Sequence, residues 1–219
     1  MTDKVPSSSV SARGAQVNRQ PFMTNHRLWF GPIAALVLVL GIFSIGVITP
    51  GYSHVRQTVS ELGEAGSPGQ VAFSVLLCLV ATCLIIFASA VARTLRVSGQ
   101  STLPAYFLGA MAISTAGVGV FSFPHPLHNI FGISEMVGYQ APLVAALVSN
   151  SKRVKVFSII MYVAVLLAIA INLVALVRPE GIWSQIKPFF GVMQRSLFAS
   201  WFIWCAGYAV LLLPRRRSG

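Results

Sequence analysis

The sequence has few charged residues and very few acidic ones. Of its 219 residues only 10% are Asp, Glu, Lys or Arg, and only five are acidic. Soluble domains usually carry about 25% charged residues, so this chain lacks the polar side chains that cover a water-facing globule. A hydrophobic content of 55% and a mean hydropathy of +0.75 indicate instead a protein that crosses a membrane several times.

Several sequence motifs are also missing. The three cysteines form no CxxC pair and predict no disulfide framework. No phosphate-binding loop, dinucleotide fingerprint, haem-attachment motif or calcium loop occurs. The net charge of +11 suggests a nucleic-acid partner, but the basic residues stand at the ends of apolar blocks and do not alternate with aromatic residues. We therefore predict no nucleic-acid binding.

Six apolar blocks are long enough to span a bilayer as helices, since about 20 residues cross its hydrocarbon core. Four of them contain no charge, and each of the other two contains one. The blocks are residues 28–49, 71–91, 103–123, 126–149, 156–177 and 190–213. The predicted fold is therefore all-α, an integral membrane bundle of six transmembrane helices over residues 28–213, with the lipid bilayer as its surroundings.

The flanking segments are polar and basic. Residues 1–27 are Ser-rich and predict a disordered tail, and residues 214–219 form a short basic tail. With six spans both tails share one side, which carries twelve of the sixteen Lys and Arg residues, against three on the other side. The positive-inside rule then places both termini in the cytoplasm and predicts a multi-pass protein of the cell membrane.

The connection from Pro50 to Gln70 is the longest one on the predicted outer side. Val55, Val59 and Leu62 recur at helical spacing and predict a short interfacial helix. This apolar stripe needs a surface on which to bury, so we expect the loop to fold back over the mouth of the bundle.

The informative polar residues gather on this outer side, and two of them are charges within spans. Glu135 and Arg195 lie at similar depths below the outer ends of their helices. A charge inside a span is costly unless it is paired or faces a wet cavity. We therefore expect an ion pair between Glu135 and Arg195, which serves either helix packing or the handling of a substrate or proton.

These residues define a candidate site with three predicted roles. Catalytic candidates are Ser60, Glu61, His128, Glu135 and Arg195. Substrate-binding candidates are Tyr52, Ser53, Tyr139 and Gln194. Metal-ligand candidates are His54, His125 and His128, a residue type that suits a catalytic zinc site. Interfacial histidines that bond only to their neighbours are the alternative to zinc.

The first outer loop resembles one known family. Pro50-Gly51-Tyr52-Ser53, then Ser60-Glu61-Leu62-Gly63 and Ser67-Pro68, resemble the "PGYS…SELG…P" pattern of the bacterial multi-pass proteins grouped as domain-of-unknown-function family 998. His128 and Arg195 match further family positions, and the resemblance covers roughly residues 28–213. Relatives carry an aspartate after the Phe-Pro that ends the third span, whereas here His125-Pro126 follows. The family implies a fold but no activity.

Two classes of function stay open. The first is an enzyme, a metal-assisted hydrolase of a lipid or lipid-linked substrate at the outer leaflet. The second is a non-enzymatic carrier of a small molecule or an assembly partner, in which the polar cluster binds a ligand. The oligomeric state is not determined by these patterns.

Overall fold

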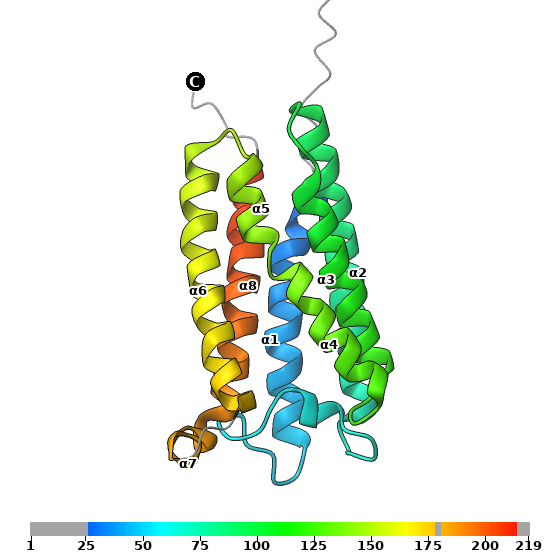
Figure 1. Ribbon diagram of the computed structural model, residues 1–219. Helices are drawn as coiled ribbons and strands as arrows, with labels where there is room; N and C mark the ends of the chain where they lie inside the picture. The colour runs from blue at the N-terminus through cyan, green and yellow to red at the C-terminus, as the bar shows by residue number, and fades with distance from the viewer. Residues whose placement is uncertain (1–25, 178–180, 214–219) are drawn as a thin grey trace, which may run out of the picture.

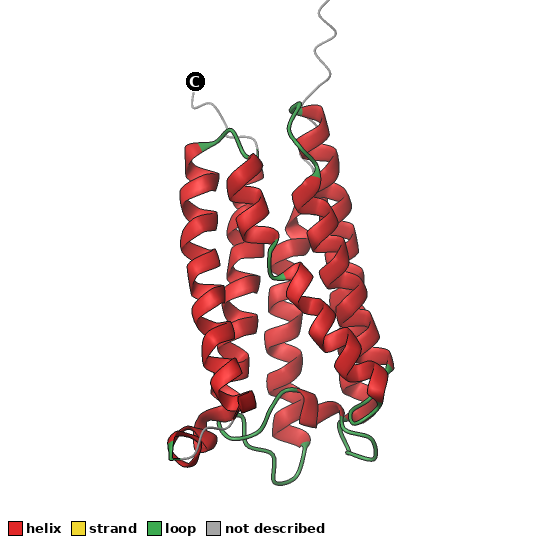
Figure 2. Ribbon diagram, in the orientation of Figure 1, coloured by secondary structure: helices red, strands yellow, loops and turns green. Residues whose placement is uncertain are grey.

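The chain folds into helices that run side by side. The computed structural model describes residues 26–177 and 181–213, and within these ranges it contains no strand (Figure 2). Six helices are long and apolar enough to cross a membrane: His26–Ile48, Gln70–Val97, Leu103–Val120, Pro126–Val148, Lys152–Val174 and Ile182–Leu212. The predicted all-α bundle with six spans is confirmed. The predicted terminal tails lie outside the described residues, apart from His26 and Arg27.

The helices form a closed circuit of neighbours (Figure 1). Helix α1 contacts α2 and α8, α2 contacts α3, α3 contacts α4 and α5, and α6 lies between α5 and α8. The elements are η1 (His26–Trp29), α1 (Phe30–Ile48), η2 (Ser60–Gly63), α2 (Gln70–Val97), α3 (Leu103–Val120), α4 (Pro126–Gly138), α5 (Ala141–Val148), α6 (Lys152–Val177), α7 (Ile182–Ile186), η3 (Lys187–Phe189) and α8 (Phe190–Leu212).

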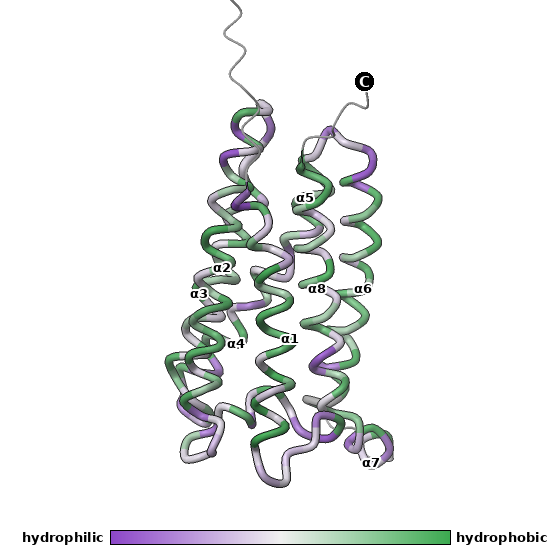
Figure 3. Tube along the Cα trace, turned by 180° about the vertical axis from the view of Figure 1, so that it is seen from behind, coloured by the Kyte–Doolittle hydropathy of each residue, from purple (hydrophilic) through white to green (hydrophobic). Residues whose placement is uncertain are grey.

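The two ends of the bundle differ. We call the end that carries the loop between α1 and α2 the loop end, and the opposite end, where α1 begins and α8 ends, the terminal end (Figure 1). Hydrophobic residues predominate along the middle of the helices, and hydrophilic residues gather toward both ends (Figure 3). This distribution fits a bilayer, in which lipid surrounds the shafts and water meets the ends.

The core of the bundle is rich in aromatic side chains. Trp201 and Trp204 of α8 are fully buried, and Tyr208 and Tyr139 are 1% exposed. Trp201 meets Tyr139 edge-on with the ring centroids 6.4 Å apart, and Trp204 stacks on Tyr208 at 4.9 Å. The contact between Trp201 and Tyr139 joins α8 to the middle of the fourth span.

The fourth span is not continuous, although the sequence predicted one helix over 126–149. Helix α4 ends at Gly138 and α5 begins at Ala141. Pro142 has no N–H to donate to the Gly138 carbonyl four residues earlier, so the helical ladder stops there. The indole Nε1 of Trp201 donates to that carbonyl instead, at 3.0 Å. Figure 1 shows α4 leaning across α3, whereas α5 runs beside α6.

Candidate polar site at the loop end

The loop between α1 and α2 is bonded to the bundle on two sides. On one side the Val192 N–H donates to the Val55 carbonyl at 3.2 Å, and the Val59 N–H donates to Gln194 Oε1 at 2.5 Å. On the other side the Ala65 N–H donates to the Phe123 carbonyl at 2.8 Å. The loop therefore lies across the loop end, as the sequence predicted.

The apolar stripe of this loop explains part of its docking. Val59 and Leu62 are buried at 3% and 0% exposure, whereas Val55 remains 45% exposed. The predicted outer helix is present only as the short 3-10 helix η2, and Val55 precedes it. The stripe is thus shorter than predicted, and hydrogen bonds to α8 hold the part of the loop around Val55.

Arg195 is the side chain that joins the loop to α8. Its Nη1 donates to the carbonyl of Gln57 and to that of Gly191, both at 2.9 Å. Its Nη2 donates to the Tyr52 hydroxyl at 2.5 Å and lies 3.3 Å from Nδ1 of His54. The fixed fork of a guanidinium suits this task, because it presents several donors in one plane to acceptors from different segments.

Tyr52 connects Arg195 to a further part of the loop. Its hydroxyl accepts from Arg195 and donates to the Thr58 carbonyl at 2.7 Å. Burial raises the pKa of Tyr52 above its ordinary value, against the hydrogen bond and positive charge of Arg195, while the charge of Glu61 raises it further. The phenol is therefore protonated at neutral pH, as its donor role requires.

His54 has one bonded and one unbonded ring nitrogen. Arginine has no acceptor, so Nδ1 of His54 accepts from Arg195 and the ring proton lies on Nε2. That Nε2 is buried and has no hydrogen-bond partner. Burial and the positive charge of Arg195 lower the pKa of His54, and the backbone of Phe43 partly opposes them. The imidazole is thus a neutral ring whose Nε2–H forms no complete hydrogen bond and feels only the backbone of Phe43.

A cleft between α1 and α8 begins at these two side chains. Its volume is about 330 Å³. His54 and Arg195 are its polar residues, and the rest of the lining is apolar: Leu38, Val39, Ile42, Phe43, Phe198, Ala199 and Phe202. Val39 and Phe43 are 59% and 61% exposed, so the cleft opens sideways on the outer surface of the helices, where lipid lies.

Two glycines make room for this arrangement. A Cβ on Gly46 of α1 would meet the ring of His54. A Cβ on Gly191 of α8 would meet the backbone oxygens of His54 and Gln57. A larger residue at Gly191 forces the loop away from α8, because backbone oxygens cannot move aside as a side chain does, whereas one at Gly46 displaces the ring of His54.

The predicted ion pair between Glu135 and Arg195 is absent, and that prediction was wrong. Glu135 accepts instead from the Tyr139 hydroxyl at 3.4 Å, one helical turn away. Arg195 uses its donors on loop and helix oxygens and on His54. The reason is local: the docked loop offers Arg195 carbonyl and hydroxyl acceptors at its own end of the bundle, so the charge needs no partner from α4.

The structure does not assemble the predicted metal site from its three histidines. His54 bonds to Arg195, Nδ1 of His128 lies 2.7 Å from the Phe121 carbonyl, and Nδ1 of His125 accepts from the Leu127 N–H at 3.1 Å as a helix cap. In residues 26–177 and 181–213, no group of three or more His, Cys, Asp or Glu side chains is placed to hold a metal ion. The metal prediction therefore has no support, because each ring already has a local structural partner.

The remaining predicted residues serve the loop itself. Oε1 of Glu61 accepts from both the N–H and the hydroxyl of Thr58 at 3.0 Å. The Ser53 N–H donates to Gln57 Oε1 at 2.8 Å. Ser60 begins η2 beside Glu61. The structure thus brings Tyr52, His54, Arg195 and Gln194 together at the loop, whereas His128, Glu135 and Tyr139 bond within and beside α4.

Sequence reasoning missed the apolar half of this site. Phe43, Phe198 and Phe202 line the cleft, but in the sequence they are ordinary members of apolar spans. Gln57 and Thr58 were missed as well, since backbone carbonyls are the groups that Arg195 and Tyr52 contact and any residue supplies a carbonyl. Only contacts across the fold identify these positions.

A comparison with protein families gives one match. The family model described as "Protein of unknown function (DUF998)" matches residues 32–211. No curated protein and no solved structure shows a significant match. The matched segment includes the whole loop, the cleft and α4, and leaves out residues 1–31 and 212–219.

Proposed function

The chain belongs to the DUF998 family of proteins of unknown function, and we propose that it binds a membrane-borne amphiphile with an acidic head group in the cleft between α1 and α8. The apolar tail lies along the cleft, and the head group meets Arg195 and His54. Of the two functional classes that the sequence left open, the proposal belongs to the second, a non-enzymatic protein that binds a ligand.

The observation that carries the proposal is the charge of Arg195. It lies within the last span and lines an apolar cleft, yet in the described parts of the chain no carboxylate forms an ion pair with it. Neutral acceptors hold the guanidinium in place, so its positive charge can still attract an anion. A charge within a span marks a ligand or ion site by default, and here an anionic head group is the complementary partner.

The unused donor of His54 supports the same ligand. Its Nε2–H is buried without a partner beside the cleft. A buried donor without an acceptor costs roughly 1–3 kcal/mol, and an oxygen of a bound ligand removes that cost. A carboxylate suits this pair, because one of its oxygens can accept from His54 while its negative charge lies beside the guanidinium, whose terminal N–H groups already bond to the protein.

The hydrolase alternative has less support. Glu61 bonds to Thr58, and His128 lies against the carbonyl of Phe121. The predicted catalytic residues Ser60, Glu61 and His128 thus show no nucleophile–base contact with one another in the described chain, and Glu135 joins Tyr139. Binding by His54 and Arg195 therefore accounts for more of the geometry than catalysis does.

The proposal includes a location. We place the protein in the cell membrane with both termini in the cytoplasm and the loop end outward, on the basis of the distribution of Lys and Arg. The cleft then opens to the outer leaflet, from which an amphiphile enters sideways without crossing water.

The test is photolabelling of the full-length protein in vesicles by a long-chain fatty acid that carries a diazirine and an alkyne. Val39→Trp fills the cleft, whereas Leu40→Trp, at an equally exposed neighbour outside the lining, is the matched control. We expect label on peptides of α1 and α8 in the wild type and in Leu40→Trp, and loss of most of it in Val39→Trp.

Competition by unlabelled ligands tests whether the acidic head group contributes to binding. An unlabelled fatty acid should compete about tenfold better than the alcohol of the same chain length, the ratio that corresponds to one charge-assisted hydrogen bond. Equal labelling of the two Trp variants contradicts the cleft as the site. Equal competition by acid and alcohol contradicts the role given to Arg195.

A further inference from the structure

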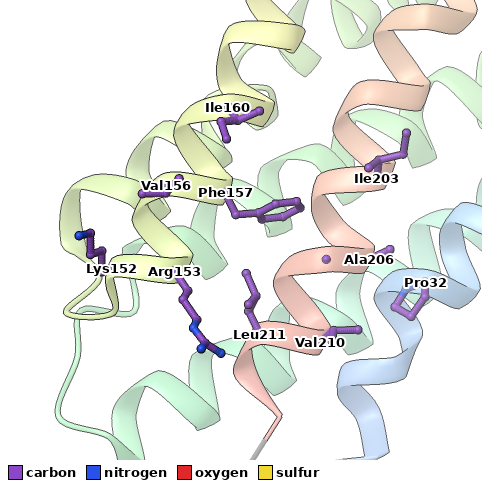
Figure 4. Close-up of a pocket in the computed structure, with 11 residues that line it drawn as sticks. Pro32, Lys152, Arg153, Val156, Phe157, Ile160, Ile203, Ala206, Val210 and Leu211 are labelled. Carbon is purple, nitrogen blue, oxygen red and sulfur yellow. The ribbon is translucent and has the colours of Figure 1, made fainter.

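A second and larger groove lies at the terminal end of the bundle. It runs between α6 and α8, with Pro32 of α1 at its side, and has a volume of about 1110 Å³ (Figure 4). This exceeds the roughly 300–1,000 Å³ of ordinary small-molecule sites and suits a long flexible chain. It is distinct from the cleft at Arg195, since the two share no lining residue.

The walls of this groove are apolar and face outward. Ile160 of α6 and Ile203 of α8 are 60% and 57% exposed. Figure 4 shows Phe157 pointing from α6 toward α8, and a Cβ on Gly207 of α8 would meet the ring of Phe157. The missing side chain of Gly207 therefore lets Phe157 form the floor, while the isoleucines line the open side.

One end of the groove is strongly basic. Lys152 and Arg153 line it, and Lys155 follows in the same first turn of α6. No acidic residue occurs in that turn. In the described part of the chain the acids are Glu61, Glu64 and Glu135, and none of them belongs to α6, α8 or the loops of the terminal end.

This placement of charge is unfavourable without an anion. A helix N-terminus carries about half a positive charge from its free N–H groups, so cations in the first turn are repelled and anions are stabilised. Three cations at this position have no carboxylate to balance them, whereas α2 places Arg96 in its last turn, where the helix dipole favours a cation.

From these observations we propose that the groove binds an anionic glycerophospholipid. Its phosphate lies at Lys152 and Arg153 by the first turn of α6, and an acyl chain follows the apolar channel along Phe157 and Ile203. This goes beyond the proposed function, because the site lies at the opposite end of the bundle and takes a phosphate-bearing lipid rather than an acidic amphiphile at Arg195.

The experiment uses native mass spectrometry on the full-length, delipidated protein. Phosphatidylglycerol and phosphatidylcholine with the same acyl chains are added separately, and inorganic phosphate is added as the tail-free anion. We expect retained adducts with phosphatidylglycerol, several-fold fewer with phosphatidylcholine, and no effect of phosphate. Removal of two juxtamembrane charges near an anionic lipid should lower the affinity for that lipid at least about tenfold. The double variant Lys152→Gln/Arg153→Gln should therefore abolish the preference for phosphatidylglycerol.

The control is a second pair of basic residues at the same end. Arg93→Gln/Arg96→Gln removes the same charge from the end of α2, outside the groove lining, and should keep the preference. Equal losses in the two double variants overturn the proposal, because they indicate only general attraction to a basic surface. Binding of phosphate alone, or equal retention of the two lipids by the wild type, overturns it too.

A measurement on the wild type keeps the proposal testable if the charge variant does not fold. Photoactivatable phosphatidylglycerol with its reactive group in the acyl chain should label the peptides that contain Phe157 and Ile203. Label confined to other faces of the bundle overturns the proposal. This result is independent of the fatty-acid experiment, since that label falls at Val39 and Phe43 near the loop end.

Discussion

At the scale of single residues, Arg195 shows how a charge is kept inside a span without a carboxylate. Two carbonyls, a phenol and an imidazole surround it, and three of these four groups come from the loop. The charge therefore stabilises the docked loop, and the docked loop in turn solvates the charge. Burial and the positive charge of Arg195 lower the pKa of His54, the imidazole of this group.

A pH dependence follows from His54. Its pKa in the folded protein lies below the ordinary value of 6.5, so the unfolded chain binds its proton first as the pH falls. The contribution of the neutral ring to stability is present above pH 6.5 and is lost as the pH falls through the folded pKa. We expect the wild-type Tm in detergent to drop between pH 7.5 and pH 5, and the drop to be smaller in His54→Asn.

His54→Asn is the matched variant because its amide oxygen keeps an acceptor for Arg195 but cannot titrate. Parallel losses of Tm in the wild type and in His54→Asn would show that other groups cause the acid sensitivity and that His54 is not a neutral partner of Arg195.

At the scale of elements, the break between α4 and α5 is stabilised by a residue of another helix. Pro142 removes the donor of the Gly138 carbonyl, and the Trp201 indole replaces it. Gln140, in the break itself, accepts from the Tyr162 hydroxyl of α6 at 2.7 Å. Within a bilayer a freed backbone group needs such a protein partner, since lipid offers none.

A double-mutant cycle tests whether the Trp201 indole replaces the backbone donor that Pro142 lacks. Trp201→Phe leaves the Gly138 carbonyl unpaired and should lower the free energy of unfolding by about 1–3 kcal/mol. Pro142→Ala restores an N–H that can bond to Gly138, so Trp201→Phe should cost less in the Pro142→Ala background. Thermal unfolding of the four proteins in detergent measures the coupling.

Trp204→Phe is the control for that cycle, because Trp204 donates to Ser158 and not to the break. Its cost should be the same in the wild type and in the Pro142→Ala background. If Trp201→Phe costs as much in both backgrounds, the indole does not replace the missing backbone donor.

At the scale of the whole molecule, the two candidate sites lie at opposite ends of the bundle and share α8. The loop end carries the cleft lined by Arg195, and the terminal end carries the groove with the basic turn of α6. In the proposed orientation, which rests on the twelve-to-three distribution of Lys and Arg, the terminal end lies in the cytoplasm. The two ligands would then come from different leaflets.

Cysteine labelling in intact cells tests this orientation. In a chain whose three native cysteines are replaced by alanine, Ala65→Cys places an exposed thiol in the loop and Ser151→Cys places one at the terminal end. A membrane-impermeant maleimide should label the first variant directly and the second only after permeabilisation. The reverse pattern would contradict the orientation and move the Arg195 cleft to the inner leaflet.

The sequence by itself determined the class of fold. Long apolar runs can satisfy their backbone in lipid only as helices, so composition and block length were sufficient to predict six spans. It also predicted that the loop folds over the bundle, because Val55, Val59 and Leu62 need a buried surface, and of these Val59 and Leu62 are buried. The PGYS and SELG segments likewise identified the family before any contact was known.

Only the tertiary structure decided which polar groups meet. Glu135 and Arg195 lie at similar depths along their helices, but depth does not fix the direction of a side chain around the helix axis, and the two residues turn to different partners. The cleft, the groove and the break at Gly138 likewise depend on which helix faces are neighbours. The sequence of an apolar helix without a polar face does not determine which of its faces packs against a neighbour, because every face is equally compatible with lipid.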